Sequence, residues 1–119
     1  DAGRKGGTTD VLGMTWETWM EFARPGKIDF IKIDIEGGEF ALLPAMSEYL
    51  AANKPVVFLS THAPFISRSN RCAAKENIRR IMQVMSVYKT CLDEKMEPVD
   101  IKNLDSDAAI DHFQSYLFI

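Results

Sequence analysis

Long apolar segments, an excess of positive charge and abundant cysteine are all missing from this chain of 119 residues. Its apolar runs fall short of the roughly 18 residues that a membrane-spanning helix requires, so we expect no membrane partner. The net charge of −3 argues against the basic surface that nucleic-acid-binding domains present. Two cysteines, Cys72 and Cys91, are too few for a disulfide framework or a zinc knuckle. Few cysteines are typical of a reducing compartment, which predicts a cytoplasmic protein and leaves the role of both thiols open.

The N-terminal segment also lacks the features of a targeting sequence. The first ten residues, DAGRKGGTTD, are polar and glycine-rich, without the apolar stretch of a secretory signal. No methionine stands at position 1, and we therefore expect a piece of a longer protein. The composition, 46% hydrophobic and 26% charged, predicts one domain with one modest core, and we expect residues 1–14 to be a flexible or edge segment.

Four segments have the pattern of β-strands. The apolar residues of 28–33 do not strictly alternate, and residues 55–60 form a nearly continuous apolar run. Both patterns are typical of strands buried on both faces in a parallel sheet, and Pro55 is tolerated as the first residue of the second strand. Residues 88–92 and 113–119 also suit strands and would pair antiparallel at one edge. A further short strand is possible at residues 99–101.

Helices are expected between these strands. Residues 15–23 would begin at the capping residue Thr15, with Trp16 and Trp19 on an apolar face that we expect in the core. Residues 39–53 would form a helix that Pro44 either breaks or begins. Residues 62–71 look like a loop, and residues 105–111 like a short helical turn. Residues 73–87 carry a clear apolar stripe, made of Ile78, Ile81, Met82 and Met85.

Acidic, glycine and histidine residues follow the two apolar strands directly. Asp34, Glu36, Gly37 and Gly38 come after the first strand, and His62 comes after the second. Because ligands bind at the carboxyl ends of parallel strands, and consecutive strands are usually neighbours, we predict that Asp34, Glu36 and His62 share one rim. The two glycines would let the chain turn sharply and let a ligand approach the backbone.

Simpler interpretations of these residues stay open. Glu36 or Glu39 would be favoured near the N-terminus of the following helix in any case, and Lys32 is a possible partner for Asp34. His62 could simply anchor its own loop. Asp34, Glu36 and His62 are also ligand types for a divalent ion, but no local spacing such as H-x-x-x-H supports one, and we assign no metal. A solvated helix face is the default explanation for the basic residues Arg68, Arg71, Lys75, Arg79 and Arg80.

The stretch IDFIKIDIEGGEFALLPAM, followed by PVVFLSTHAPF, resembles the FkbM-type methyltransferases, which are Rossmann-like enzymes that use S-adenosylmethionine. In that family a strand reads hydrophobic-Lys-hydrophobic-Asp-hydrophobic-Glu-Gly-x-Glu. The matching positions here are Lys32, Asp34, Glu36, Gly37 and Glu39. The family's next strand commonly ends in an acid before the histidine, whereas this chain has Thr61 before His62.

The resemblance implies an α/β fold: a partial Rossmann-like sheet of parallel core strands with a C-terminal antiparallel pair and helices on both faces. Residues 1–119 would be the C-terminal portion of one domain, because the family's glycine-rich cofactor loop should lie upstream. Gly3 to Gly7 follow no apolar run and do not suit that role. The first core strand would then have an open edge, which predicts a homo-oligomer formed through it.

The resemblance also implies an activity in the complete domain, methyl transfer from S-adenosylmethionine to a hydroxyl of a sugar or small metabolite. His62 would be the general base, since the ordinary pKa of a histidine, about 6.5, suits proton removal near neutrality. Asp34 would face the cofactor's methionine end or the acceptor, together with Ile35 as a cofactor contact, and Glu36 would orient the acceptor. The residues predicted to contact substrate are Glu36, Gly37, Gly38 and Thr61.

Two functions of other classes remain as alternatives. One is a non-catalytic association module or degenerate domain, which the missing cofactor loop favours for this chain alone. The other is a hydrolase on a β/α barrel, with Asp34 and Glu36 at strand ends, against which the antiparallel tail argues.

Overall fold

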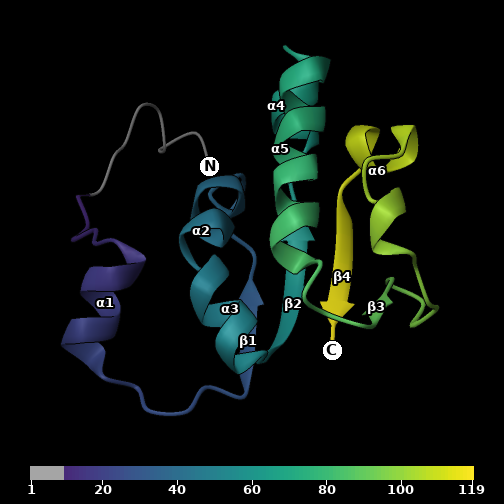
Figure 1. Ribbon diagram of the computed structural model, residues 1–119. Helices are drawn as coiled ribbons and strands as arrows, with labels where there is room; N and C mark the ends of the chain where they lie inside the picture. The colour runs from purple at the N-terminus through teal and green to yellow at the C-terminus, as the bar shows by residue number, and fades with distance from the viewer. Residues whose placement is uncertain (1–9) are drawn as a thin grey trace.

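The computed structural model describes residues 10–119 and shows helices and strands in alternation for most of the chain (Figure 1). The order is α1 (Trp16–Ala23), β1 (Phe30–Ile33), α2 (Glu39–Ala45), α3 (Ser47–Asn53), β2 (Val56–Thr61), α4 (Pro64–Ser67), α5 (Arg71–Met85), β3 (Cys91–Leu92), the 3₁₀ helix η2 (Ile101–Asn103), α6 (Asp107–Asp111) and β4 (Gln114–Phe118).

The four strands form one mixed sheet in the order β1-β2-β4-β3. β1 and β2 pair in parallel, with Ile33 beside Leu59. β4 lies antiparallel to β2 on one side and to β3 on the other. The prediction of parallel core strands with a C-terminal antiparallel pair is therefore confirmed, and so is the α/β class, compatible with a partial Rossmann-like fold. An open sheet with antiparallel strands is not the closed parallel barrel of the hydrolase alternative.

The core lies between one face of this sheet and the helices that cover it. Alternate residues such as Ile33, Leu59 and Phe118 point into it and are nearly inaccessible to solvent. Residues of the opposite face, such as Phe30 and Lys32, are exposed. Figure 1 shows α5 lying across β2 on the covered side. The core residues of α2, α3 and α5 belong to the same buried cluster.

One part of the predicted fold, helices on both faces, is therefore not seen in residues 10–119. The physical reason lies in the hand of the crossovers. The chain moves across the sheet in one direction from β1 to β2 and on toward β3. Right-handed connections that advance in one direction place their helices on the same side.

The first helix begins where its capping residue predicts. The Thr15 hydroxyl accepts a hydrogen bond from the Thr18 N–H, and α1 starts at the next residue, Trp16. Trp16 packs edge-on against Tyr49 of α3, with ring centroids 5.3 Å apart. The prediction that both tryptophans are core residues holds only in part: Trp16 is partly buried and packs against the core cluster, whereas Trp19 is 36% exposed. The helix rests against α2 and α3 rather than in the core.

The remaining helices follow the predicted pattern with local differences. The 39–53 segment is two helices that meet at Met46, and Pro44 lies inside the first of them. Asn70 caps α5 through its side chain, and Ile78, Ile81 and Met85 are buried as predicted.

The C-terminal third differs more from the prediction. The segment 62–71 is not only a loop, since it contains the one-turn helix α4. The strand predicted at 88–92 is reduced to two residues, and the possible strand at 99–101 is instead a bridge between Leu92 and Pro98 followed by η2.

The predicted flexible or edge segment 1–14 is described only in part. Residues 10–14 belong to no helix or strand. The interpretation of Gly3 to Gly7 lies outside the described residues.

Candidate functional site

The ends of the two parallel strands bring an acid and a histidine together. Asp34 follows β1 directly and its side chain is 47% exposed, whereas the His62 side chain, just after β2, is 12% exposed. The Nε2 atom of His62 lies 3.4 Å from Oδ1 of Asp34. The predicted proximity of Asp34 and His62 is thus confirmed. Lys32 forms no ion pair with Asp34.

A second carboxylate, Glu39, contacts the same histidine from inside the protein. Its side chain is fully buried. Oε1 accepts a hydrogen bond of 2.7 Å from the His62 backbone N–H and lies 3.2 Å from His62 Nδ1. Oε2 accepts a hydrogen bond of 2.8 Å from the Gly37 N–H. Glu39 therefore ties the turn after β1 to the residue after β2.

The sequence prediction missed this role of Glu39. An acidic residue in the first turn of a helix is common for electrostatic reasons alone, and that interpretation hid the long-range contact. The available signal was its place in the family signature, where it stands with Asp34 and Glu36.

A tight turn at residues 35–38 connects β1 to α2. The Gly38 N–H donates to the Ile35 carbonyl at 3.1 Å, and both central residues have positive φ, 52° at Glu36 and 107° at Gly37. Glycine suits the second position because a side chain rarely adopts that backbone. At Gly38 an added Cβ would come within 3.0 Å of Ile35 Cδ1, so the Ile35 side chain occupies the space.

Glu36 is not brought into contact with the other predicted residues. It is exposed, and the structure records no hydrogen bond or ion pair between it and Asp34 or His62. Its left-handed backbone is uncommon for a residue other than glycine, and such positions cluster at functional turns.

Two half-exposed phenylalanines, which we call the aromatic rim, flank His62. The Phe65 ring stacks on the His62 ring at 5.6 Å, and the Phe113 ring meets it edge-on at 5.8 Å. Phe65 is 48% exposed and Phe113 is 49% exposed. The Arg68 guanidinium lies 5.9 Å from the centre of the Phe113 ring. The site thus has an apolar, cation-bordered surface that the sequence prediction did not identify, because Phe113 precedes β4 and is distant in sequence.

Thr61, predicted to contact substrate, is 3% exposed, and its hydroxyl donates to the Gln114 carbonyl at 3.3 Å. The neighbouring Ser60 hydroxyl pairs with that of Ser115 at 3.0 Å. Both hydroxyls therefore have partners on β4.

The arrangement suits proton transfer better than metal binding. In the part of the chain that the structure describes, no three His, Cys, Asp or Glu side chains are grouped to hold a metal ion, so Asp34, Glu36 and His62 do not form a ligand triad. Two carboxylates that flank an imidazole stabilise the imidazolium that forms when the ring takes up a proton.

Within residues 10–119, no helix has the length and apolar character that crossing a membrane requires.

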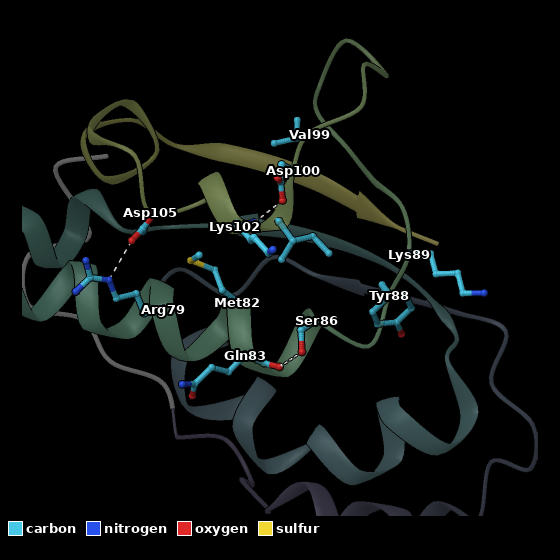
Figure 2. A pocket seen from close by; sticks show the side chains of 11 residues that line it. Arg79, Met82, Gln83, Ser86, Tyr88, Lys89, Val99, Asp100, Lys102 and Asp105 are labelled. Carbon is cyan, nitrogen blue, oxygen red and sulfur yellow. Dashed lines mark hydrogen bonds and ion pairs between the residues drawn. The ribbon is translucent and has the colours of Figure 1, made fainter.

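A cavity of about 810 Å³ lies elsewhere, between the second half of α5 and η2 (Figure 2). Met82 and Val99 line it, and Arg79 pairs with Asp105 at 3.0 Å across its rim. None of the predicted site residues lines this cavity.

Acids neutralise part of the predicted basic cluster. Arg79 is paired as above, and Arg71 pairs with Asp107 at 2.8 Å and with Asp111. These carboxylates raise the pKa of Arg71 and fasten the start of α5 to α6. Both arginines stay about half-exposed, in keeping with the predicted solvated helix face, and pair with acids of the same chain.

The two cysteines are free thiols in different settings, Cys72 exposed and Cys91 buried. Burial, with the Asp93 charge as a lesser cause, raises the pKa of Cys91 to about 11. Cys91 is therefore a neutral core residue rather than a nucleophile.

Comparison with known proteins gave one match. The family model described as Methyltransferase FkbM domain matches residues 4–95, a range that includes both parallel strands, Glu39 and His62. No curated protein matched the chain, and no solved structure matched it. Since the match spans well over half of the sequence and agrees with the fold and with the motif at the end of β1, this chain belongs to the FkbM methyltransferase family.

Proposed function

We propose that this chain is the C-terminal part of an S-adenosylmethionine-dependent domain that methylates a hydroxyl of a sugar or small metabolite. The observation that carries the proposal is His62, held between Asp34 and the buried Glu39 where the parallel strands end. Membership of a methyltransferase family gives the reaction class.

In this proposal His62 is the general base. When bound, S-adenosylmethionine supplies a methyl group on a positively charged sulfur. Nε2 of His62 would take up the proton of the acceptor hydroxyl, whose oxygen would receive that methyl group. The resulting positive ring lies beside two carboxylates, which offsets the cost of charging a mostly buried imidazole.

The described residues suit only one end of the cofactor. Asp34 is half-exposed and would accept a hydrogen bond from the amino group of the methionine part, next to the half-exposed Ile35. A glycine-rich loop after a strand, which would hold the rest, does not occur in residues 10–119. The turn after β1 contains only two glycines, Gly37 and Gly38, and its Gly37 N–H already donates to the Glu39 carboxylate. We therefore propose that upstream residues of a longer parent protein complete the cofactor site.

The acceptor would lie against the aromatic rim. Exposed rings beside a general base favour an acceptor with an apolar face, such as a sugar ring, because aromatic side chains supply contact area at low entropic cost. Arg68, at the edge of Phe113, would contact a polar or acidic group of the same acceptor. Glu36, Gly37 and Gly38 would border the acceptor from the turn.

Calorimetric titration with S-adenosylhomocysteine tests the cofactor part of the proposal. We expect the full-length parent to bind it, this chain alone to bind it poorly, and Asp34→Ala in the parent to weaken binding. Asp29→Ala is the matched control, since Asp29 is an exposed acid at the opposite end of β1. Absence of binding by the parent, or equal affinity in Asp34→Ala, would reject the assignment.

A second candidate function, association, is favoured by the free edge of β1. β1 ends the sheet, and Phe30 on it is 55% exposed. Unpaired backbone groups on such an edge can pair with another strand, and we propose that isolated copies form a homo-oligomer there. Size-exclusion chromatography with light scattering that shows a clean monomer at high concentration would remove this proposal.

We also propose a cytoplasmic location. Two cysteines that are free thiols, one of them exposed, suit a reducing compartment. Fractionation of cells that produce the protein would test it, and recovery from an oxidising compartment would contradict it.

A further inference from the structure

We infer that Glu39 is a positioning residue that holds neutral His62 in the Nδ1–H tautomer, so that Nε2 keeps the lone pair that accepts a proton. The consequence for catalysis rests on the proposed function, but the tautomer itself does not.

The hydrogen-bond geometry around Glu39 makes it an acceptor. Its two oxygens each receive one backbone N–H, from His62 and Gly37, at 2.7 and 2.8 Å. An ionised carboxylate can only accept. With Glu39 ionised, the third contact, 3.2 Å from Oε1 to His62 Nδ1, is a hydrogen bond only when the proton is on Nδ1.

The opposite carboxylate competes weakly for the ring proton. Asp34 Oδ1 is 3.4 Å from Nε2, and its side chain is 47% exposed, so water screens it. Glu39 is fully buried, where an unpaired charge is costly and a hydrogen bond to it is strong. The buried partner should thus decide the tautomer, and the exposed side of the ring is left for the acceptor.

Packing also fixes the ring. The backbone N–H of His62 shares Oε1 with its own Nδ1, and Phe65 and Phe113 restrict rotation of the ring. Rotation of the imidazole by half a turn would lose the contact with Glu39. Glu39 therefore determines both which nitrogen carries the proton and which nitrogen faces the site.

The test is histidine ¹⁵N NMR on this chain, at a pH high enough that the ring signals no longer move. His112 is an internal reference, because it is exposed and its ring has no hydrogen bond to the described residues; such rings favour the Nε2–H tautomer in water. We expect His62 to show Nδ1–H and His112 to show Nε2–H. His62 found mainly as Nε2–H would overturn the inference without any variant.

Variants then separate positioning from a structural role. In Glu39→Leu no acceptor faces Nδ1, and we expect His62 to shift toward Nε2–H. Asp34→Asn should leave His62 as Nδ1–H. Glu48→Leu, the same change at an exposed position in α3, should change nothing. A folded Glu39→Leu protein that keeps the Nδ1–H tautomer would contradict the inference. This readout needs neither cofactor nor acceptor, so its failure is distinguishable from failure to bind S-adenosylhomocysteine.

Discussion

Replacing Tyr88 with phenylalanine should destabilise the fold by removing one buried hydrogen bond. Tyr88 is 5% exposed, and its hydroxyl donates to the Pro55 carbonyl at 2.5 Å. This bond ties the segment after α5 to the start of β2, the strand that ends just before His62. Without the hydroxyl, the carbonyl loses its partner in a buried place, which costs about 1–3 kcal/mol.

The size of this effect should depend on pH. Burial raises the pKa of Tyr88 from 10.0 to about 12, so the folded state favours the protonated phenol. The phenol's contribution to stability is complete below pH 10 and is lost as pH rises toward 12. At about pH 11 the unfolded chain releases this proton and the folded chain retains it. The free energy of unfolding of the wild type therefore falls by about 1.4 kcal/mol, a loss that Tyr88→Phe does not share.

Urea unfolding of both proteins at about pH 8 and about pH 11 measures the two effects. The difference between wild type and Tyr88→Phe should shrink by about 1.4 kcal/mol at the higher pH. Burial also raises the pKa values of Tyr116 and Cys91, to about 12 and about 11. Both residues are present in each protein, so their contributions cancel in the difference between the two free energies of unfolding. Tyr49→Phe is the control at pH 8, where we expect less than about 0.5 kcal/mol. A Tyr88→Phe protein as stable as wild type at pH 8, or a difference that does not narrow at pH 11, would refute the reasoning.

Three further changes test other parts of the structure. Gly37→Ala should destabilise by about 1–3 kcal/mol in urea unfolding, because φ is 107° there, whereas Gly13→Ala, with open space around it, should be nearly neutral; equal effects would disprove the strained turn. Asn70→Ala should cost about 1 kcal/mol through loss of the α5 cap, and an unchanged thermal midpoint would contradict this. Phe65→Ala in the full-length parent should raise KM by up to about tenfold with little change in kcat; an unaltered KM would remove the aromatic rim from acceptor binding.

Much of the site's position was predictable from local sequence. Two apolar runs with polar ends imply neighbouring parallel strands, and that alone places Asp34 near His62. The Thr15 cap and the α5 stripe were predictable for the same reason, because each depends on residues within a few positions of one another.

Features that depend on distant contacts were not predictable. Glu39 has the same local sequence signal whether it stabilises a helix terminus or bonds to a residue 23 positions away. The insertion of β4 between β2 and β3, which brings Phe113 to His62, is a choice of pairing partner that no local pattern specifies. The placement of helices on both faces of the sheet is not seen in residues 10–119, because the direction of the crossovers, not the helix pattern, decides which face of the sheet a helix covers.

The most direct test of the central claim is methyl transfer by the full-length parent carrying His62→Ala, followed as S-adenosylhomocysteine release over a panel of hydroxylated acceptors. The account predicts that kcat falls by about 10²- to 10⁴-fold, the usual contribution of a general base, while affinity for S-adenosylhomocysteine stays the same. Turnover equal to that of the unmodified parent would contradict it.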